Sequence, residues 1–323
     1  MSLQEMQSHH KSRIPLPTVS TEEKQILTHD GLTLAGTHYL PSSTPKAAIL
    51  VNSGTGMKRQ LYTAFASALA EEGFAVLTYD YRGIGDSRPE SLGKCEASVL
   101  DWAQKDMTAA FDLLLHLWPE QPHYVFGHSA GGLLIGFMEN ADQIDGIVTW
   151  GTSYGYWGHL RGTEKLIYRT MFTVGIPLLN TLFHYIPNSM MGRGEDIPAG
   201  VASDYARWGK RPDFFESELG QHPGFGRVTC PWKAFLAEDD DIATPENAYP
   251  VYRQYHRADV DIEMLSPGQL GLKELGHHRI FSRSNREAWS LISDWFKTLP
   301  LRQKNNEYPS IPTVSLEHSS SLH

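Results

Sequence analysis

A serine between two glycines is the residue of this chain best placed to do chemistry. It lies in the run Gly127-His128-Ser129-Ala130-Gly131, a G-x-S-x-G pattern with a strand-like apolar segment before it and a helix-like one after it. A serine at such a tight turn exposes its hydroxyl, and small neighbours prevent a clash beside it. The next amide lies at a helix N-terminus, where developing negative charge is stabilised. The pattern therefore predicts a nucleophilic Ser129.

Serine is a poor nucleophile until a base removes its proton, so a histidine and an acid that orients it should follow. An aspartate run after a predicted strand and a histidine pair before the last predicted helix supply the candidates: Asp239, Asp240, Asp241, His277 and His278. The order serine, acid, histidine is the one expected for this type of nucleophile turn. Because no HExxH or CxxC pattern occurs, the sequence predicts neither a metal site nor a cofactor.

Strand-like and helix-like segments alternate along most of the chain. Residues 23–52 contain two alternating runs around an Asp30-Gly31 turn and then the apolar run AAILVN, which predicts a hairpin that leads into a buried strand. Helical periodicity predicts helices at residues 61–72, 103–117, 131–140, 245–255 and 286–299. This alternation predicts an α/β fold with a doubly wound, mostly parallel sheet covered on both faces.

The alternation stops between residues 153 and 227, a stretch with helical character and no clear strands. We interpret this stretch as a helical cap inserted into one core domain, which residues 21–152 and 228–302 form. Residues 1–20 and 303–323 are polar and are predicted to be a flexible arm and a flexible tail.

The composition excludes several classes of protein. With 41% hydrophobic and 20% charged residues, the 323-residue chain can bury a large core and is not of the disordered type. A net charge of −9 disfavours nucleic-acid binding, since phosphates are repelled. Cys95 and Cys230 are too few for a disulfide scaffold or a structural zinc site. The start lacks the apolar run of a signal peptide, and no stretch approaches 18 apolar residues, which predicts a soluble cytoplasmic protein without a membrane span.

Several segments resemble the α/β-hydrolase superfamily, within it the branch of serine-aminopeptidase-like and monoacylglycerol-lipase-like hydrolases. The matching segments lie between residues 48 and 281 and read ILVNSGTGMKRQLY, VLTYDYRGIGDSRP, VFGHSAGG, FLAEDDDIATP and LGHHRIF. The YRGIGDS loop is especially characteristic of this branch; its Arg82 and Asp86 are expected to brace the loop. Two longer segments, GRGEDIPAGVASDYARWGK and MLSPGQLGLKELGHHRIF, resemble a bacterial subgroup of predicted hydrolases.

The resemblance implies a role for each matched residue. Ser129 matches the nucleophile of the family. The family's acid stands two residues before an aliphatic residue, which selects Asp240 and leaves Asp241 as the alternative. The family's histidine follows a glycine and precedes the last helix, which selects His277 and leaves His278 as the alternative.

The oxyanion loop departs from the family pattern. Where the branch commonly has His-Gly-x-Gly, this chain has Ser53-Gly54-Thr55-Gly56. Thr55 takes the position whose backbone amide binds the oxyanion, with Gly54 as the alternative, and the amide of Ala130 is the second expected donor. The missing histidine removes a side chain that often braces this loop.

Together these assignments predict a serine hydrolase that cleaves a carboxylic ester or thioester through an acyl-enzyme on Ser129, with a small-molecule acyl substrate. A serine peptidase or an acyltransferase on the same triad is one alternative, and a non-catalytic binding scaffold is another. Glu195 and Asp196 in the cap could bind the amine of an aminopeptidase substrate. Apolar cap residues could line an acyl pocket or pack the cap: Tyr154, Tyr156, Trp157, Phe172, Leu178, Leu179 and Phe183.

Overall fold

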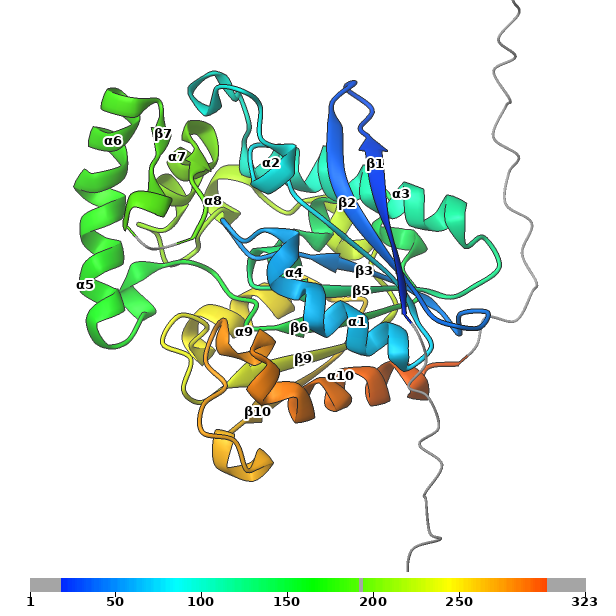
Figure 1. The fold of residues 1–323 in the computed structure, drawn as a ribbon. Helices are drawn as coiled ribbons and strands as arrows, with labels where there is room; N and C mark the ends of the chain where they lie inside the picture. The colour runs from blue at the N-terminus through cyan, green and yellow to red at the C-terminus, as the bar shows by residue number, and fades with distance from the viewer. Residues whose placement is uncertain (1–18, 192–193, 301–323) are drawn as a thin grey trace, which may run out of the picture.

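The computed structural model describes residues 19–191 and 194–300. Eight strands form one sheet in the order β1-β2-β4-β3-β5-β6-β9-β10 (Figure 1). Strand β2 pairs antiparallel with β1 and with β4, and all the other pairs are parallel. The strands are β1 Ser20–Leu27, β2 Thr33–Leu40, β3 Ala48–Asn52, β4 Ala75–Tyr79, β5 His123–His128, β6 Gly146–Trp150, β9 Pro231–Ala237 and β10 Asp259–Leu265. The predicted mostly parallel sheet and its N-terminal hairpin are confirmed. The predicted tail and most of the predicted arm lie outside the described residues.

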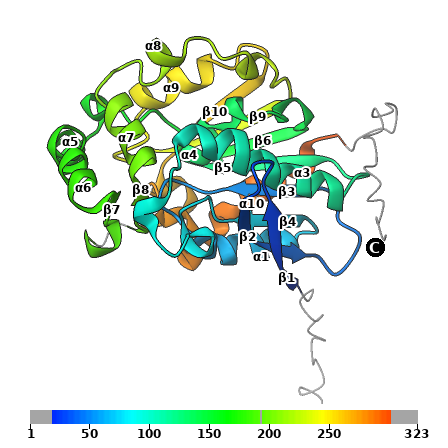
Figure 2. The same cartoon turned by 90° about the horizontal axis from the view of Figure 1, so that it is seen from above.

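Helices cover both faces of this sheet (Figure 2). Helices α1 (Thr63–Glu71) and α10 (Arg286–Thr298) pack on one face through residues such as Phe65 and Trp289. Helices α3 (Thr108–Leu117) and α9 (Pro245–Arg253) pack on the other face. Each helix buries one apolar side against the strands, and this gives the doubly wound arrangement that the alternation predicts.

The three central strands β3, β5 and β6 are buried along their whole length. They read as nearly continuous apolar runs because helices cover both sides of a parallel sheet. Parallel strands end at the same edge, so the loops that follow β3, β5, β6 and β9 meet there. The loops that carry the candidate catalytic residues therefore meet because these strands run in the same direction.

The helix after β5 is shorter than predicted. The sequence predicts a helix at residues 131–140, but α4 covers only Ala130–Leu133, and a 3-10 turn follows at Ile135–Phe137. The reason lies at Gly136, whose amide donates to the phenol of Tyr255 at 2.9 Å instead of continuing the helix. This glycine also lies against the ring of Phe225, where a Cβ atom would come within 2.6 Å.

The chain between β6 and β9 is mainly helical and lies at one end of the molecule (Figure 1). Its elements are α5 Gly162–Thr170, a π-helical turn Met171–Gly175, α6 Ile176–Phe183, β7 Tyr185–Ile186, β8 Ile197–Pro198, α7 Ala199–Trp208 and α8 Glu216–Leu219. The short antiparallel pair β7–β8 is a difference from the sequence analysis, which finds no strands here. Two residues per strand are too few to produce an alternating pattern. A small apolar core that includes Phe172 and Ile176 holds the helices together.

Helices α5 and α6 join through the π-helical turn into one helix from Gly162 to Phe183. This 22-residue helix is the one described helix that is long and apolar enough, by length and composition alone, to cross a membrane. The sequence has no run of 18 apolar residues here, because Glu164, Lys165 and Arg169 interrupt the first half of this helix. In the structure the helix is largely exposed, with 11% of its most apolar window buried.

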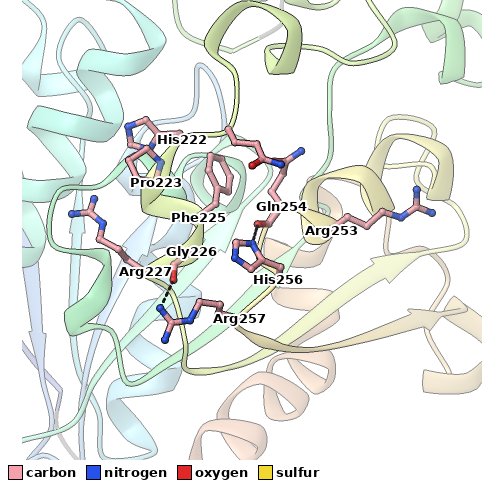
Figure 3. Close-up of a pocket in the computed structure, with 10 residues that line it drawn as sticks. His222, Pro223, Phe225, Gly226, Arg227, Arg253, Gln254, His256 and Arg257 are labelled. Carbon is pink, nitrogen blue, oxygen red and sulfur yellow. Dashed lines mark hydrogen bonds between the residues drawn. The ribbon is translucent and has the colours of Figure 1, made fainter.

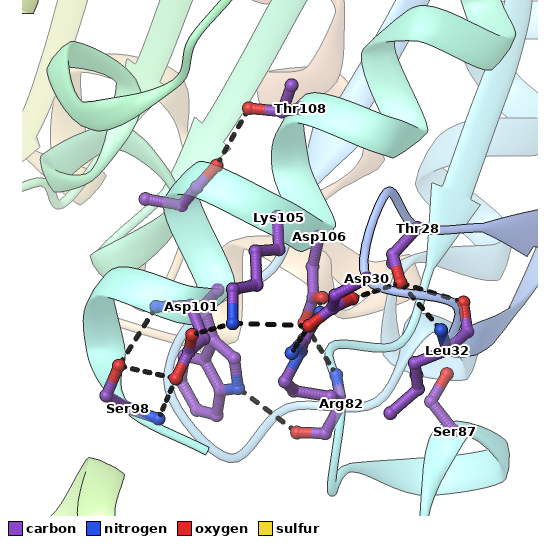
Figure 4. Close-up of polar contacts among 12 residues, drawn as sticks. Thr28, Asp30, Leu32, Arg82, Ser87, Ser98, Asp101, Lys105, Asp106 and Thr108 are labelled. Carbon is purple, nitrogen blue, oxygen red and sulfur yellow. Dashed lines mark hydrogen bonds and ion pairs between the residues drawn. The ribbon is translucent and has the colours of Figure 1, made fainter.

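The loop after β4, which contains the YRGIGDS motif, is held by a buried ion-pair network (Figure 4). The Arg82 side chain donates to Asp106 at 2.7 Å and to Asp30 at 2.8 Å, and the Arg82 amide donates to Asp106 at 2.8 Å. Asp106 is fully buried on the π-helical turn Trp102–Met107 that joins α2 (Val99–Asp101) to α3. Arg82 therefore fastens the loop to this helix, the bracing role expected from the sequence.

Replacing Asp106 by alanine should strongly destabilise the fold. The substitution leaves the buried Arg82 guanidinium without its main partner, so we expect the free energy of unfolding to fall by about 3–5 kcal/mol. Lys105→Ala is the matched control in the same network, since Lys105 pairs with Asp30 and Asp101 while partly exposed and should cost about 1 kcal/mol or less. Urea denaturation followed by circular dichroism measures both. Equal decreases in the free energy of unfolding of the two variants would contradict this account of the network.

Candidate active site

Ser129 occupies a strained backbone conformation at the turn between β5 and α4. Its φ is 52° and its ψ is −115°, a region that residues with a side chain rarely adopt. The glycines beside it are required by packing, because a Cβ on Gly131 would collide with the carbonyl oxygen of Asn52 at the end of β3. A Cβ on Gly127 would lie 2.6 Å from the Cα of Gly132. The turn thus holds the Ser129 hydroxyl at the carboxyl edge of the sheet.

The structure brings Ser129, His277 and Asp240 into one hydrogen-bonded line. Ser129 Oγ lies 2.9 Å from His277 Nε2, and His277 Nδ1 lies 2.7 Å from Asp240 Oδ2. The Asp240 and His277 side chains are both buried, while Ser129 is partly exposed. Because the carboxylate can only accept, Nδ1 of His277 carries the proton and Nε2 is free to accept from the serine hydroxyl.

The three consecutive aspartates have three different environments. Asp239 accepts hydrogen bonds from the amides of Leu275 and Gly276, at 2.9 and 3.0 Å, and so anchors the loop that carries His277. Asp240 points at His277 itself. Asp241 is exposed, and no hydrogen bond joins its carboxylate to either histidine in the described part of the chain.

The second histidine of the pair lies beside the hydrogen-bonded line, with its ring centroid 4.7 Å from that of His277 and 5.4 Å from that of His128. His278 is exposed, whereas its neighbour His277 is buried between Ser129 and Asp240. Of the alternatives that the sequence leaves open, the hydrogen-bonded line contains Asp240 and His277. Asp241 and His278 lie outside it.

The charge of His277 and three hydrogen bonds hold Asp240 in its ionised form. Burial by itself raises the pKa of Asp240, but the imidazole of His277 and the amides of Ala243 and Ile242 outweigh burial and lower the pKa below its ordinary value. The two amides donate to Oδ1 at 2.9 and 2.8 Å, which leaves Oδ2 for His277. The carboxylate is therefore oriented as well as charged.

Two backbone amides near Ser129 are available to a ligand. The amide of Gly54, one of the two candidates in the oxyanion loop, already donates to the phenol of Tyr62 at 2.9 Å. The amides of Thr55 and Ala130 donate to no other group in the described residues. The Thr55 hydroxyl donates to the phenol of Tyr205 on α7 at 2.8 Å, which fixes the loop against the helical region between β6 and β9. This geometry favours Thr55 over Gly54 as a donor.

Residues that the sequence analysis did not assign complete the site. Gly151 follows β6 with a φ of 60°, and a Cβ there would lie 3.1 Å from His277 Nδ1 and 3.2 Å from Asp240 Oδ2. The residue at this position must therefore be small and tolerate a left-handed backbone. Tyr62 and His128 lie buried beneath the site and connect its loops. A glycine directly after a predicted central strand is the one sequence signal that points to Gly151.

Three histidines near the serine form a cluster whose ligand atoms lie within 4.8 Å of one another: His128, His277 and His278. Both ring nitrogens of His277 are engaged by Ser129 and Asp240. Both ring nitrogens of His128 are engaged as well, by Tyr62 and the His277 carbonyl oxygen. A metal ion would have to break these bonds, so the residues do not fit a metal centre.

A cavity of about 550 Å³ lies away from this site (Figure 3). Residues between 221 and 227 and between 253 and 257 line it, near the amino ends of β9 and β10. The Arg227 guanidinium donates to two carbonyl oxygens of the loop before β6, and that of Arg257 donates to the carbonyl of Gly226. These arginines hold surface loops together at the edge of the sheet opposite Ser129.

Known structures share the overall fold of this protein. A carboxyl esterase from Bacillus coagulans in complex with glycerol is similar with a TM-score of 0.56 and 14% identity, over 87% of this chain and 99% of that chain. A hypothetical protein from Pseudomonas aeruginosa is similar with a TM-score of 0.58 and 18% identity, over 93% of this chain and 100% of that chain. At such identities the likeness shows the fold alone, and this fold is that of the α/β-hydrolases.

Sequence similarity points to a narrower group. Residues 43–194 match the family model described as serine aminopeptidase, S33. Monoglyceride lipase of Rattus norvegicus is 30% identical over 105 residues, which cover 32% of this chain and 34% of the lipase. An uncharacterized 31.7 kDa protein of Escherichia coli is 39% identical over 64 residues, 18% of this chain and 22% of that protein. The match to monoglyceride lipase therefore spans about a third of that lipase. These similarities confirm the predicted resemblance to the monoacylglycerol-lipase-like branch.

The lowered pKa of Asp240 predicts a pH-dependent contribution to stability. A carboxyl whose pKa is lower in the folded state stabilises the fold above its unfolded pKa of about 4, and loses this contribution as the pH falls further. Wild type should therefore be more stable than Asp240→Asn near neutral pH, and the difference should shrink below about pH 4. Urea denaturation over a pH series measures it, with exposed Asp241→Asn as control. A difference that stays constant down to the lowest pH would refute the prediction.

Proposed function

We propose that the protein is a serine hydrolase that cleaves a carboxylic ester, or a thioester, through an acyl-enzyme on Ser129. The observation that carries this proposal is the line from Asp240 through His277 to Ser129, with distances of 2.7 and 2.9 Å, on a strained turn. Strain of this kind is kept where it serves a function, because the rest of the fold must hold it in place. The esterase and lipase relatives support the same reaction class.

The proposed reaction begins with attack of Ser129 Oγ on the acyl carbonyl carbon. His277 Nε2 takes the serine proton as the new bond forms, and Asp240 stabilises the resulting imidazolium. The amides of Thr55 and Ala130 donate to the oxyanion of the tetrahedral intermediate. His277 then protonates the leaving group, which departs and leaves the acyl-enzyme. Water then attacks the acyl carbon while His277 takes its proton, the bond from the acyl carbon to Ser129 Oγ breaks, and His277 returns the proton to Oγ as the acid leaves.

The environment of Glu195 and Asp196 favours an ester over a peptide with a free amine. Glu195 pairs with Lys58 at 2.9 Å, and Asp196 pairs with Arg88 at 3.0 Å. Asp196 also accepts from the hydroxyl and the amide of Ser189. Both carboxylates are therefore committed within the protein, and an aminopeptidase would need one of them free for the substrate amine.

We further propose that residues 153–227 act as a cap on the core formed by residues 21–152 and 228–302. This region reaches the oxyanion loop directly, since Tyr205 accepts from the Thr55 hydroxyl and the amide of Glu195 donates to the carbonyl of Gly56 at 3.0 Å. A small-molecule acyl substrate would then bind between the region and the serine. A cytoplasmic location remains a prediction from composition.

Most of the apolar cap residues named from the sequence pack inside the protein. Tyr154 is buried and stacks on Phe214, and Phe172 belongs to the small apolar core of the cap, against which Trp157 and Leu179 pack. Leu178 and Phe183 are exposed on α6. The packing role therefore accounts for more of them than an acyl pocket does.

A fluorophosphonate probe should label wild type and fail to label Ser129→Ala, because the probe reacts with an activated serine. His277→Ala should lose labelling and ester turnover, while the control His278→Ala should keep both, since only His277 contacts Ser129. Initial rates on p-nitrophenyl esters of increasing chain length would size the acyl site. A folded protein that is never labelled would favour the binding scaffold. Faster turnover with added alcohol would favour the acyltransferase.

The aspartate run offers a matched pair of variants. Asp240→Asn should lower kcat by about 10⁴-fold, because an amide no longer holds the productive tautomer of the imidazole. Asp241→Asn should leave kcat near the wild-type value, since this neighbouring carboxylate is exposed and lies outside the hydrogen-bonded line. Steady-state kinetics on one p-nitrophenyl ester compares the two. A large decrease in kcat in Asp241→Asn, with no decrease in Asp240→Asn, would assign Asp241 as the acid.

A further inference from the structure

A chain of three hydrogen bonds runs beneath the candidate active site. The Gly54 amide lies 2.9 Å from the phenol oxygen of Tyr62, which lies 2.7 Å from Nδ1 of His128. Nε2 of His128 then lies 2.9 Å from the carbonyl oxygen of His277. The chain starts in the oxyanion loop, passes through the residue before Ser129 and ends on the backbone of the candidate catalytic histidine.

The direction of every bond in this hydrogen-bond chain follows from its two ends and from a neutral His128. A backbone amide can only donate, so the Tyr62 oxygen accepts from Gly54, and a carbonyl can only accept, so His128 Nε2 donates to His277. Burial lowers the pKa of His128 well below its ordinary value, so the ring is neutral and its Nδ1 carries no proton. Nδ1 therefore accepts from the Tyr62 hydroxyl.

The surroundings leave this chain little freedom to rearrange. Tyr62 and His128 are both fully buried. The ring of Phe281, in the turn after His277, packs edge-on against both of them with centroid distances of 4.6 and 4.8 Å. A Cβ on Gly54 would lie 2.9 Å from His128 Nδ1, so a larger residue there would push into the same bond.

We propose that Tyr62 and His128 are positioning residues, whose hydrogen-bond chain sets the oxyanion loop and the His277 backbone at one fixed spacing around Ser129. Neither side chain touches the reacting atoms. Tyr62, held in turn by His128, braces the oxyanion loop of this protein, which begins with Ser53 where the related branch has a histidine. This inference rests on the proposed hydrolase function.

The hydrogen-bond chain should contribute more to stabilising the transition state than to binding the substrate. If it breaks, the Thr55 amide and the His277 ring can shift relative to Ser129, and small displacements of donors cost rate more than affinity. The expected result for Tyr62→Phe is a fall in kcat of about 10- to 100-fold with KM nearly unchanged. Phenylalanine keeps the ring that packs on Phe281 and removes only the hydroxyl.

The experiment compares wild type, Tyr62→Phe, His128→Gln and the double variant on one p-nitrophenyl ester. Inhibition by a trifluoromethyl ketone, which forms a tetrahedral adduct with an active serine, is measured in parallel. Affinity for this inhibitor should fall by the same factor as kcat/KM, a link that a loss of stability alone would not produce. Because the two residues act through one hydrogen-bond chain, kcat of the double variant should be no lower than kcat of the less active single variant.

Tyr39→Phe is the matched control, since Tyr39 is also buried and also bonds through its hydroxyl, to Thr63 at 3.2 Å, away from the serine. It should keep wild-type kcat and inhibitor affinity. Should Tyr62→Phe fail to fold, His128→Gln tests the chain from its other end. In ¹⁵N-histidine spectra of wild type, His128 should stay neutral with its proton on Nε2.

The outcomes separate this inference from the function on which it rests. An active wild type with Tyr62→Phe and His128→Gln variants that match it in kcat and inhibitor affinity overturns the positioning role alone. A fall in kcat without a parallel fall in inhibitor affinity also overturns it. A folded wild type that neither hydrolyses esters nor reacts with the fluorophosphonate overturns both proposals.

Discussion

The structure depends on holding one side-chain-bearing residue in a left-handed backbone conformation. Ser129 has a φ of 52°, which costs free energy of about 1–3 kcal/mol that neighbouring packing must offset. The amide of Ser129 donates to the carbonyl of Trp150 on β6, and Gly131 fits against Asn52 at the end of β3. The turn is thus clamped between the strands on either side of β5. A fully buried centre of the sheet is therefore what holds the partly exposed Ser129 in this conformation.

The same requirement for fixed spacing explains the density of contacts around the oxyanion loop. The Gly54 amide donates to Tyr62, and the Thr55 hydroxyl donates to Tyr205 on α7. Gly56 accepts from the amide of Glu195. Three consecutive residues thus connect the loop to the core of the sheet and to the helical region between β6 and β9.

Much of the fold could be predicted from the sequence because its signals are local. Alternating strands and helices, a hairpin around Asp30 and glycines around Ser129 each depend on a few neighbouring residues. The aspartate run and the histidine pair could be found but not resolved, because one residue of register decides which side chain points inward. Asp239 illustrates this limit, since it turns toward the amides of Leu275 and Gly276 rather than toward a ring.

Other features depend on contacts between distant segments and leave no local pattern. The early end of α4 follows from a bond between Gly136 and Tyr255, 119 residues later. The preference for Thr55 over Gly54 depends on the hydroxyl of Tyr62. In the sequence His128 occupies only the variable position of the G-x-S-x-G pattern. Its hydrogen-bond partners, Tyr62 and the His277 carbonyl, lie 66 residues before it and 149 residues after it.

The exposed helix from Gly162 to Phe183 has a consequence for the behaviour of the protein in concentrated solution. Its C-terminal part, residues 170–183, carries no charged side chain, and Val174, Leu178 and Leu182 are each more than half exposed. At low ionic strength the net charge of −9 keeps molecules apart. Added salt screens this repulsion and strengthens apolar contacts. Self-association through this helix should therefore increase with salt, opposite to the behaviour of proteins held together by ion pairs.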